Sequence, residues 1–164
     1  MVIKQLSVFV ENQPGRLSEI TDVLSGREIN IRALSIADTT NFGILRLIVD
    51  HPSRAESALK EQGFTVSQTS VIGVGIEDRP GGLAEALNIL REAGMDVEYM
   101  YAFVSHAEKT AYVILRVADN DAAEKVLRDH GIPILFVPEG KIKVRPEDIL
   151  RGKLRATAIS EIRL

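Results

Sequence analysis

The sequence Glu11-Asn12-Gln13-Pro14-Gly15-Arg16-Leu17 occurs again, in altered form, as Glu77-Asp78-Arg79-Pro80-Gly81-Gly82-Leu83. Each copy follows an apolar run with strand-like alternation and precedes a run with helical spacing. In each, an Asx residue that can cap a helix stands just before Pro-Gly, so the helix should begin with unpaired backbone N–H groups. These groups, the helix dipole and a glycine that admits a ligand to the main chain all favour an anion. A carboxylate is therefore the expected ligand group.

The two copies extend well beyond this loop. Leu17 aligns with Leu83 at an offset of 66 residues (83 minus 17), and Ala55 aligns with Ala123 at 68 (123 minus 55). A two-residue insertion in a loop explains the change of offset. Two copies of about 65 residues are too few for a solenoid, so the sequence predicts two small domains in tandem. The predicted boundaries are residues 1–70, 71–138 and a C-terminal extension of 139–164.

Each copy is predicted to fold in the order βαββαβ. In the first, the strand with Leu6, Val8 and Val10 is followed by a helix, and a second strand begins at Ile29 and Ile31. The apolar phase then shifts, which suggests a bulge. The remaining elements are a hairpin loop at 39–43, a central strand at 44–49, a helix from Pro52 and a last strand at 64–71. This is an α+β, ferredoxin-like arrangement: an antiparallel sheet with both helices on one face.

The composition is that of an ordinary soluble globular protein. The chain has 164 residues, 45% of them hydrophobic, and a mean hydropathy of +0.05. The absence of cysteine favours a reducing, cytoplasmic location. No apolar stretch approaches the roughly 20 residues of a membrane span, and the first residues do not form an export signal, so no membrane association is predicted. A net charge of -3 disfavours nucleic acid as a partner.

The chain resembles a tandem pair of ACT domains, the small amino-acid-sensing modules attached to many enzymes of amino-acid metabolism. The resemblance covers residues 1 to about 138 and rests on the two loops together with Ile29-Asn30-Ile31 and Met95-Asp96-Val97. It implies a site at the interface between ACT domains, where loop amides hold the carboxylate of the ligand. The Asx residues of loop and strand start would hold its polar groups, Asn12 with Asn30 and Asp78 with Asp96.

The expected ligand contacts therefore belong to the two loops and the two strand starts. They are Asn12, Gln13, Gly15, Arg16, Leu17, Asn30 and Ile31 in the first copy, and Asp78, Arg79, Gly81, Gly82, Leu83, Asp96 and Val97 in the second. The first site is expected to bind more tightly, because amides donate and accept hydrogen bonds whereas an ionised Asp only accepts them. In the conformational alternative, Asn12 and Asp78 serve only as helix N-caps. The recurrence of Asx at all four positions favours a binding site.

Other functions find little support in the sequence. The three histidines are scattered, so no metal site is predicted, and Gly73-Val74-Gly75 lacks the third glycine of a dinucleotide-binding loop. No cofactor and no catalytic residues are predicted. RNA-recognition modules share the βαββαβ order, but the third strands at 43–49 and 111–117 lack their basic-aromatic pattern.

The sequence thus predicts a non-catalytic regulatory protein that binds a small amino acid. The alternative is a ligand-independent protein–protein interaction module attached to an enzyme of amino-acid metabolism, which would then be its partner. A homodimer is expected, because each sheet leaves a face or an edge to cover and ACT domains pair edge to edge. The extension at 139–164 carries a net charge of +3 (7 basic minus 4 acidic residues) and is expected to be a packed extension or a dimer contact.

Overall fold

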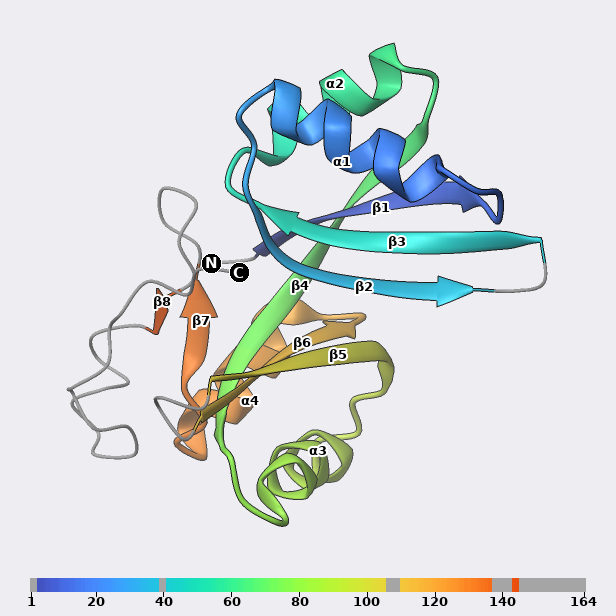
Figure 1. The fold of residues 1–164 in the computed structure, drawn as a ribbon. Helices are drawn as coiled ribbons and strands as arrows, with labels where there is room; N and C mark the ends of the chain where they lie inside the picture. Colours follow the sequence, from blue (N-terminus) through green and yellow to red (C-terminus); the bar gives the residue numbers. More distant parts are fainter. Residues whose placement is uncertain (1–2, 39–40, 106–109, 137–142, 145–164) are drawn as a thin grey trace. The chain divides into compact units, whose positions relative to one another are not determined.

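The computed structural model describes residues 3–38, 41–105, 110–136 and 143–144 (Figure 1). These residues divide into two compact units. The N-terminal unit holds Lys4–Thr69, and the C-terminal unit holds Ile3 and residues 70–136 with Lys143 and Val144. Most of the predicted extension at 139–164 therefore lies outside the described residues.

The N-terminal unit has the predicted βαββαβ order. Its elements are β1 (Ile3–Glu11), α1 (Arg16–Gly26), β2 (Ile31–Asp38), β3 (Phe42–Val49), α2 (Pro52–Glu61) and the first part of β4 (Thr65–Glu77). The strands are arranged in the order β2-β3-β1-β4, with β3 antiparallel to both β1 and β2. The predicted bulge is confirmed by a register shift between Ile31 and Ala33. The second strand begins at Ile31 rather than at Ile29.

The C-terminal unit repeats this arrangement. The later part of β4 is its first strand, followed by α3 (Gly82–Glu92), β5 (Val97–Ser105), β6 (Thr110–Val117), α4 (Asn120–Asp129), β7 (Ile134–Phe136) and the short β8 (Lys143–Val144). Here the order is β7-β4-β6-β5, and all three pairs are antiparallel. A register shift between Val97 and Tyr99 matches the bulge of β2. Both units are therefore ferredoxin-like, as predicted.

One face of each sheet packs against its two helices (Figure 1). In the N-terminal unit, alternate residues of β1 and β3 meet apolar residues of α1 and α2. The buried cluster is Leu6, Val8, Val10, Ile20, Leu24, Ile29, Leu45, Leu47, Val49, Ala55, Leu59, Phe64 and Val66. The residues that alternate along the strands and those that recur at helical spacing therefore pack into one core.

The C-terminal unit has an equivalent core between β4, β6, α3 and α4. It includes Ile72, Val74, Ile76, Ala86, Leu90, Val113, Leu115, Ala123, Leu127 and Ile134. Gly73 is required by close packing, because a Cβ there would lie 2.8 Å from Ile3 Cδ1 and 3.0 Å from Leu135 Cβ. The Gly73-Val74-Gly75 sequence thus lies inside a strand, with Gly75 N donating to Pro133 O at 2.9 Å.

Candidate functional site

The two Pro-Gly loops have nearly the same backbone conformation. Gly15 has φ 88° and ψ −17°, and Gly81 has φ 90° and ψ −13°, so both occupy the left-handed region that favours glycine. Each glycine is the N-cap of the following helix, α1 or α3. The repeated sequence therefore encodes a repeated turn.

Hydrogen bonds within each loop hold this turn. In the first loop, Gln13 N donates to Glu11 O at 2.8 Å and Arg16 N to Gln13 O at 3.4 Å. In the second, Arg79 N donates to Glu77 O at 2.9 Å and Gly82 N to Arg79 O at 3.1 Å. The second turn is closed more tightly at the helix start.

The Asx residues of the loops do not cap the helices. The capping alternative for Asn12 and Asp78 is wrong, because the N-caps are Gly15 and Gly81 and neither helix has a side-chain cap. The proline and the left-handed glycine lengthen the turn and leave each Asx three residues before the N-cap. Asp119 shows the contrast, since its carboxylate accepts from Ala122 N at 3.0 Å at the start of α4. Asn12 instead anchors its loop, with its backbone N–H 3.0 Å from Asn41 O.

The starts of α1 and α3 present backbone donors. Glu19 N and Glu85 N are bonded to Gly15 O and Gly81 O at 2.9 and 3.0 Å. Within the part of the chain that the structure describes, no acceptor lies within bonding distance of the N–H groups one and two residues earlier. Those groups belong to Leu17 and Ser18 in α1, and to Leu83 and Ala84 in α3. They lie at the positive end of the helix dipole, where an anion is favoured.

Each loop also carries one arginine, at different positions. Arg16 Nη1 lies 2.6 Å from Glu19 Oε2, and its guanidinium lies 4.8 Å from the ring centroid of Phe64. Arg79 Nε contacts Glu77 Oε2, and its Nη2 lies 2.9 Å from Glu85 Oε2. The hydrogen bond and charge of Glu77, aided by Glu85, raise the pKa of Arg79, which remains cationic. Each cation is thus paired with glutamate beside the free N–H groups.

Gly82 occupies the position of Arg16 in the repeat and is closely packed. A Cβ at Gly82 would overlap the carbonyl oxygen of Glu77. At Gly81, the nearest atom to an added Cβ is 3.9 Å away, and at Gly15 none lies within 4 Å. The two left-handed glycines therefore leave open space over the main chain, whereas Gly82 does not.

Asn30, at the start of the second strand, is held by Asp50, which sequence reasoning missed. Asp50 accepts from Asn30 N at 3.1 Å and from Asn30 Nδ2 at 3.0 Å, and Asp50 N donates to Asn30 O at 3.2 Å. Arg32 Nη2 lies 3.7 Å from the same carboxylate. The available signal was register, because Asp50 directly follows the third strand, which pairs with the strand that begins after Asn30.

In the C-terminal unit the corresponding positions are Asp96 and Ala118. Both are exposed, and Asp96 has no hydrogen bond or ion pair with any residue that the structure describes. The predicted contacts Ile31 and Val97 are half-buried where β2 and β5 begin. The two strand starts thus differ in how their Asx side chain is held.

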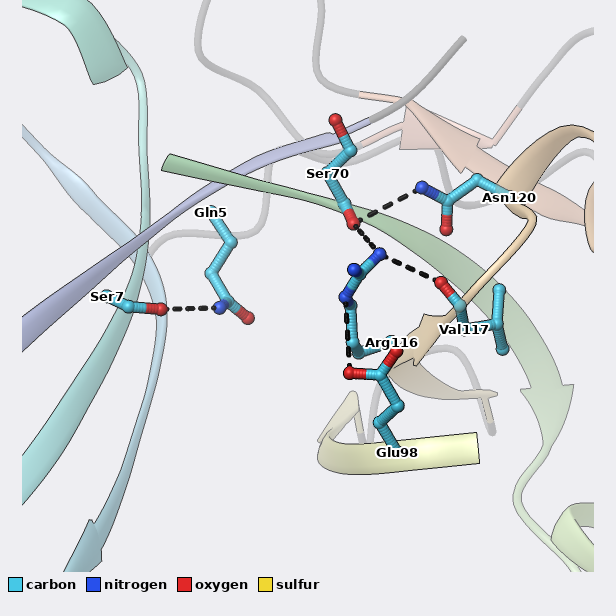
Figure 2. Close-up of polar contacts among 7 residues, drawn as sticks. All are labelled: Gln5, Ser7, Ser70, Glu98, Arg116, Val117 and Asn120. Atoms are coloured by element: carbon cyan, nitrogen blue, oxygen red, sulfur yellow. Dashed lines mark hydrogen bonds and ion pairs between the residues drawn. The ribbon is translucent and has the colours of Figure 1, made fainter. Parts of the chain in front are cut away.

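A polar cluster that the sequence did not indicate lies nearby in the same unit (Figure 2). Arg116 Nη1 donates to Val117 O at 2.8 Å and to Ser70 O at 3.3 Å, and Arg116 Nε lies 3.6 Å from Glu98 Oε2. Asn120 Nδ2 donates to the same Ser70 carbonyl at 3.2 Å. These contacts occupy the guanidinium with backbone and carboxylate acceptors of the unit itself.

Loop and strand start lie at opposite ends of each sheet. Glu11 pairs with Phe42 and Ile31 with Val49, seven residues apart on β3 (49 minus 42), which is roughly 24 Å of strand. β1 and β2 are both antiparallel to β3, so the end of one and the start of the other cannot meet. In the C-terminal unit, Glu77 pairs with Thr110 and Val97 with Val117. Asn12 and Asn30, or Asp78 and Asp96, therefore cannot hold one ligand inside a single unit, and a site shared by them requires a second domain.

No helix in the described ranges has the length and apolar character to cross a membrane. No three His, Cys, Asp or Glu side chains in those ranges are grouped so that they could hold a metal ion. The loops and strand starts offer backbone N–H donors and Asx side chains, which can bind a polar ligand.

Comparison with known proteins identifies the family. A family model described as an ACT domain pair matches residues 1–140. Protein BT0572 from Bacteroides thetaiotaomicron is 43% identical over 82% of this chain and 92% of its own, with a TM-score of 0.78. The regulatory subunit of aspartate kinase from Thermus thermophilus is 18% identical over 77% of this chain and 91% of its own, with a TM-score of 0.59. The corresponding subunit from Thermus flavus is 14% identical over 79% and 93%, with a TM-score of 0.57, so these two show the fold.

No curated protein matches the sequence. The match of the family model to most of the chain and the two ferredoxin-like units lead to the same result. The chain belongs to the ACT domain family, as a pair of ACT domains in tandem.

Proposed function

We propose that this chain is a regulatory protein without catalytic activity that binds a small amino acid at its two Pro-Gly loops. The observation that carries the proposal is the pair of free N–H groups at each helix start, beside a left-handed glycine with open space above it. A carboxylate accepts hydrogen bonds from such groups and is favoured by the dipole. The fold shared with regulatory subunits of aspartate kinase supports a regulatory role by analogy.

The proposed contacts keep the residues predicted from sequence but divide them into two half-sites. One half-site is the loop: Asn12, Gln13, Gly15, Arg16 and Leu17, or Asp78, Arg79, Gly81, Gly82 and Leu83. The other is the strand start: Asn30 and Ile31, or Asp96 and Val97. Because the half-sites of one unit lie roughly 24 Å apart, a ligand at a loop would need the strand start of another domain. A second copy of the chain can supply it.

Exposed apolar residues in the N-terminal unit support such a dimer. Leu34 and Ile36 on the edge strand β2 are 56% and 47% exposed. Phe9 and Phe42 are also exposed, on the face away from the helices, with ring centroids 4.9 Å apart. Edge strands and apolar patches of this kind mark sites of association. Light scattering should give the mass of a dimer at micromolar concentration, and a monomer that ligand does not shift would oppose the proposal.

A thermal-shift screen with the twenty standard amino acids tests the binding function. A ligand at 100 times its dissociation constant stabilises the folded chain by about 2.7 kcal/mol. Absence of any shift, confirmed by calorimetry, would favour the ligand-independent interaction module instead.

Two variant pairs locate the site. Ser18→Pro and Ala84→Pro remove one of the free N–H groups in the first helical turn, where proline is tolerated. Ser18→Ala and Ala84→Gly keep the N–H and serve as matched controls. The proline variants should lose affinity while the controls retain it. Equal affinity in both members of each pair would exclude the helix starts as the carboxylate site.

A mixing experiment tests whether one ligand uses two copies of the chain. Asn12→Ala and Asn30→Ala should each weaken binding by about 10- to 100-fold, the usual cost of losing a hydrogen bond to a charged group. After unfolding and refolding of an equal mixture, about a quarter of the first-repeat sites should have both asparagines, because half of the dimers are mixed. No recovery of tight binding in the mixture would refute the shared site.

A further inference from the structure

We propose that Asp50 orients the Asn30 side chain so that the strand start of the N-terminal unit binds the ammonium group of an α-amino acid. Asp50 acts through Asn30 and is a positioning residue. The inference rests on the proposed function and adds which end of the amino acid this half-site takes.

The contacts of Asp50 leave Asn30 little choice of orientation. The Asp50 side chain is only 8% exposed, and its two oxygens accept from the backbone and the side-chain N–H of Asn30 at 3.1 and 3.0 Å. If the amide of Asn30 turned over, its oxygen would face the carboxylate. That orientation would replace a charge-assisted hydrogen bond with two opposed acceptors. Asp50 therefore keeps the nitrogen of Asn30 turned inward.

The oxygen of Asn30 is consequently the acceptor left for a ligand, while one of the two N–H groups on Nδ2 is bonded to Asp50. Asn30 is exposed, and its Oδ1 has no partner in the ranges that the structure describes. A carbonyl oxygen accepts hydrogen bonds and cannot donate them, so it suits an ammonium group and not a carboxylate. Asp50 also offsets the nearby charge of Arg32, whose Nη2 lies 3.7 Å away and would otherwise repel a cation.

The second repeat reaches the same chemistry without a positioning residue. Asp96 stands where Asn30 does, and Ala118 stands where Asp50 does. An ionised Asp offers only acceptors, so it needs no neighbour to choose its orientation. Both strand starts therefore present oxygen, and the loops present N–H groups. The two kinds of half-site match the two charged ends of an α-amino acid.

The test compares each of the twenty amino acids with the carboxylic acid that lacks its α-amino group. Calorimetry is done in an Ala84→Pro background, so that the first repeat dominates. The chain that carries only Ala84→Pro should bind the amino acid more tightly than the acid that lacks the α-amino group. Asp50→Ala should reduce that preference about tenfold, by the loss of one hydrogen bond to a charged group. Asn30→Asp combined with Asp50→Ala copies Asp96 and Ala118 and should restore it.

Thermal unfolding of each variant separates folding defects from changes in preference, and the double variant keeps the test valid if Asp50→Ala is unstable. A preference that survives Asp50→Ala, or that the double variant fails to restore, overturns the role of Asp50 while amino-acid binding stands. If the unaltered chain binds none of the twenty amino acids, the proposed function fails, and the role of Asp50 fails with it.

Discussion

The two Pro-Gly loops show how one backbone conformation is kept with different side chains. Gly15 and Gly81 differ by only 2° in φ (90 minus 88), and both precede a helix of 11 residues. The residue after each glycine differs: Arg16 is half-buried beside Phe64, whereas Gly82 leaves no room for a Cβ. The left-handed glycine is thus needed for the turn itself. The second glycine of Gly81-Gly82 is needed only where the helix start lies against Glu77.

The arginines near the two loops differ in position but pair with equivalent glutamates. Arg16 and Arg79 are three residues apart in the repeat alignment (82 minus 79), yet each pairs with the glutamate of the first helical turn, Glu19 or Glu85. The cation has changed position while its partner has stayed in place.

Gly82→Ala should have the largest effect. Its Cβ would overlap a backbone carbonyl oxygen, which cannot move without disturbing β4 or α3. Overpacking of this kind costs about 1–3 kcal/mol, so the free energy of unfolding in urea should fall by that amount. Gly26→Ala, at the end of α1 and with no atom within 4 Å of its Cβ, is the control and should not destabilise the chain. If both variants are equally stable, the close approach of Gly82 to Glu77 is not maintained in solution.

Gly15→Ala and Gly81→Ala should cause the next largest loss of stability, and the two losses should be equal. A left-handed conformation costs a residue with a Cβ roughly 1–2 kcal/mol, and neither site adds a close contact. Equal losses in urea denaturation would show that the two turns are energetically equivalent. A difference well beyond experimental error would show that one loop is held by contacts that the other lacks.

Acid should lower the stability of the N-terminal unit through protonation of Glu56, by less than the glycine substitutions do. The hydrogen bond from Lys60, with a further bond from Gln68, lowers the pKa of Glu56. A lowered pKa adds stability above the ordinary value of 4.5, and this stability is lost as the pH falls through the folded-state value. The pair is worth about 0.2–0.5 kcal/mol, typical of Glu and Lys four residues apart on a helix. Glu56→Gln should flatten the acid limb of a plot of stability against pH, and an unchanged limb would argue against the contribution.

Arg79→Gln should have the smallest effect on stability. It gives the second loop the residue found at Gln13 and removes a guanidinium that is half-exposed, as are Glu77 and Glu85. Exposed ion pairs contribute little, because water and salt screen them. Thermal unfolding at low and high salt should give the same midpoint for the variant and the parent chain. A midpoint that falls only at low salt would show that this pairing does stabilise the second loop.

The first site is still expected to bind the ligand more tightly than the second, but for a different physical reason. The sequence predicts tighter binding at the first site because Asn12 and Asn30 can donate hydrogen bonds as well as accept them. Asp50 accepts from one of the two N–H groups of the Asn30 amide and keeps its nitrogen turned inward, so at the strand starts both repeats offer an acceptor. The remaining difference in charge lies in the loops, where Asn12 is neutral and Asp78 is acidic. Tighter binding at the first loop stays a prediction, and it now depends on Asn12 alone.

The amino-acid sequence by itself determined the repeat, the βαββαβ order, the bulged second strand and the position of the two turns. These features are local, because burial of a strand or helix face repeats every 2 or 3.6 residues, and left-handed turns require glycine. The same locality explains the error at Asn12 and Asp78, where general capping preference lost to the longer Pro-Gly turn.

Only the tertiary structure decided which side chains meet. Strand register brings Asp50 to Asn30 and places Asn12 at the far end of the same sheet, and neither result follows from spacing along the chain. The packing of Gly82 on Glu77 likewise depends on how α3 leaves β4. Periodicity specifies which face of an element is buried, whereas the partner of a polar side chain depends on alignment between strands that are distant in sequence.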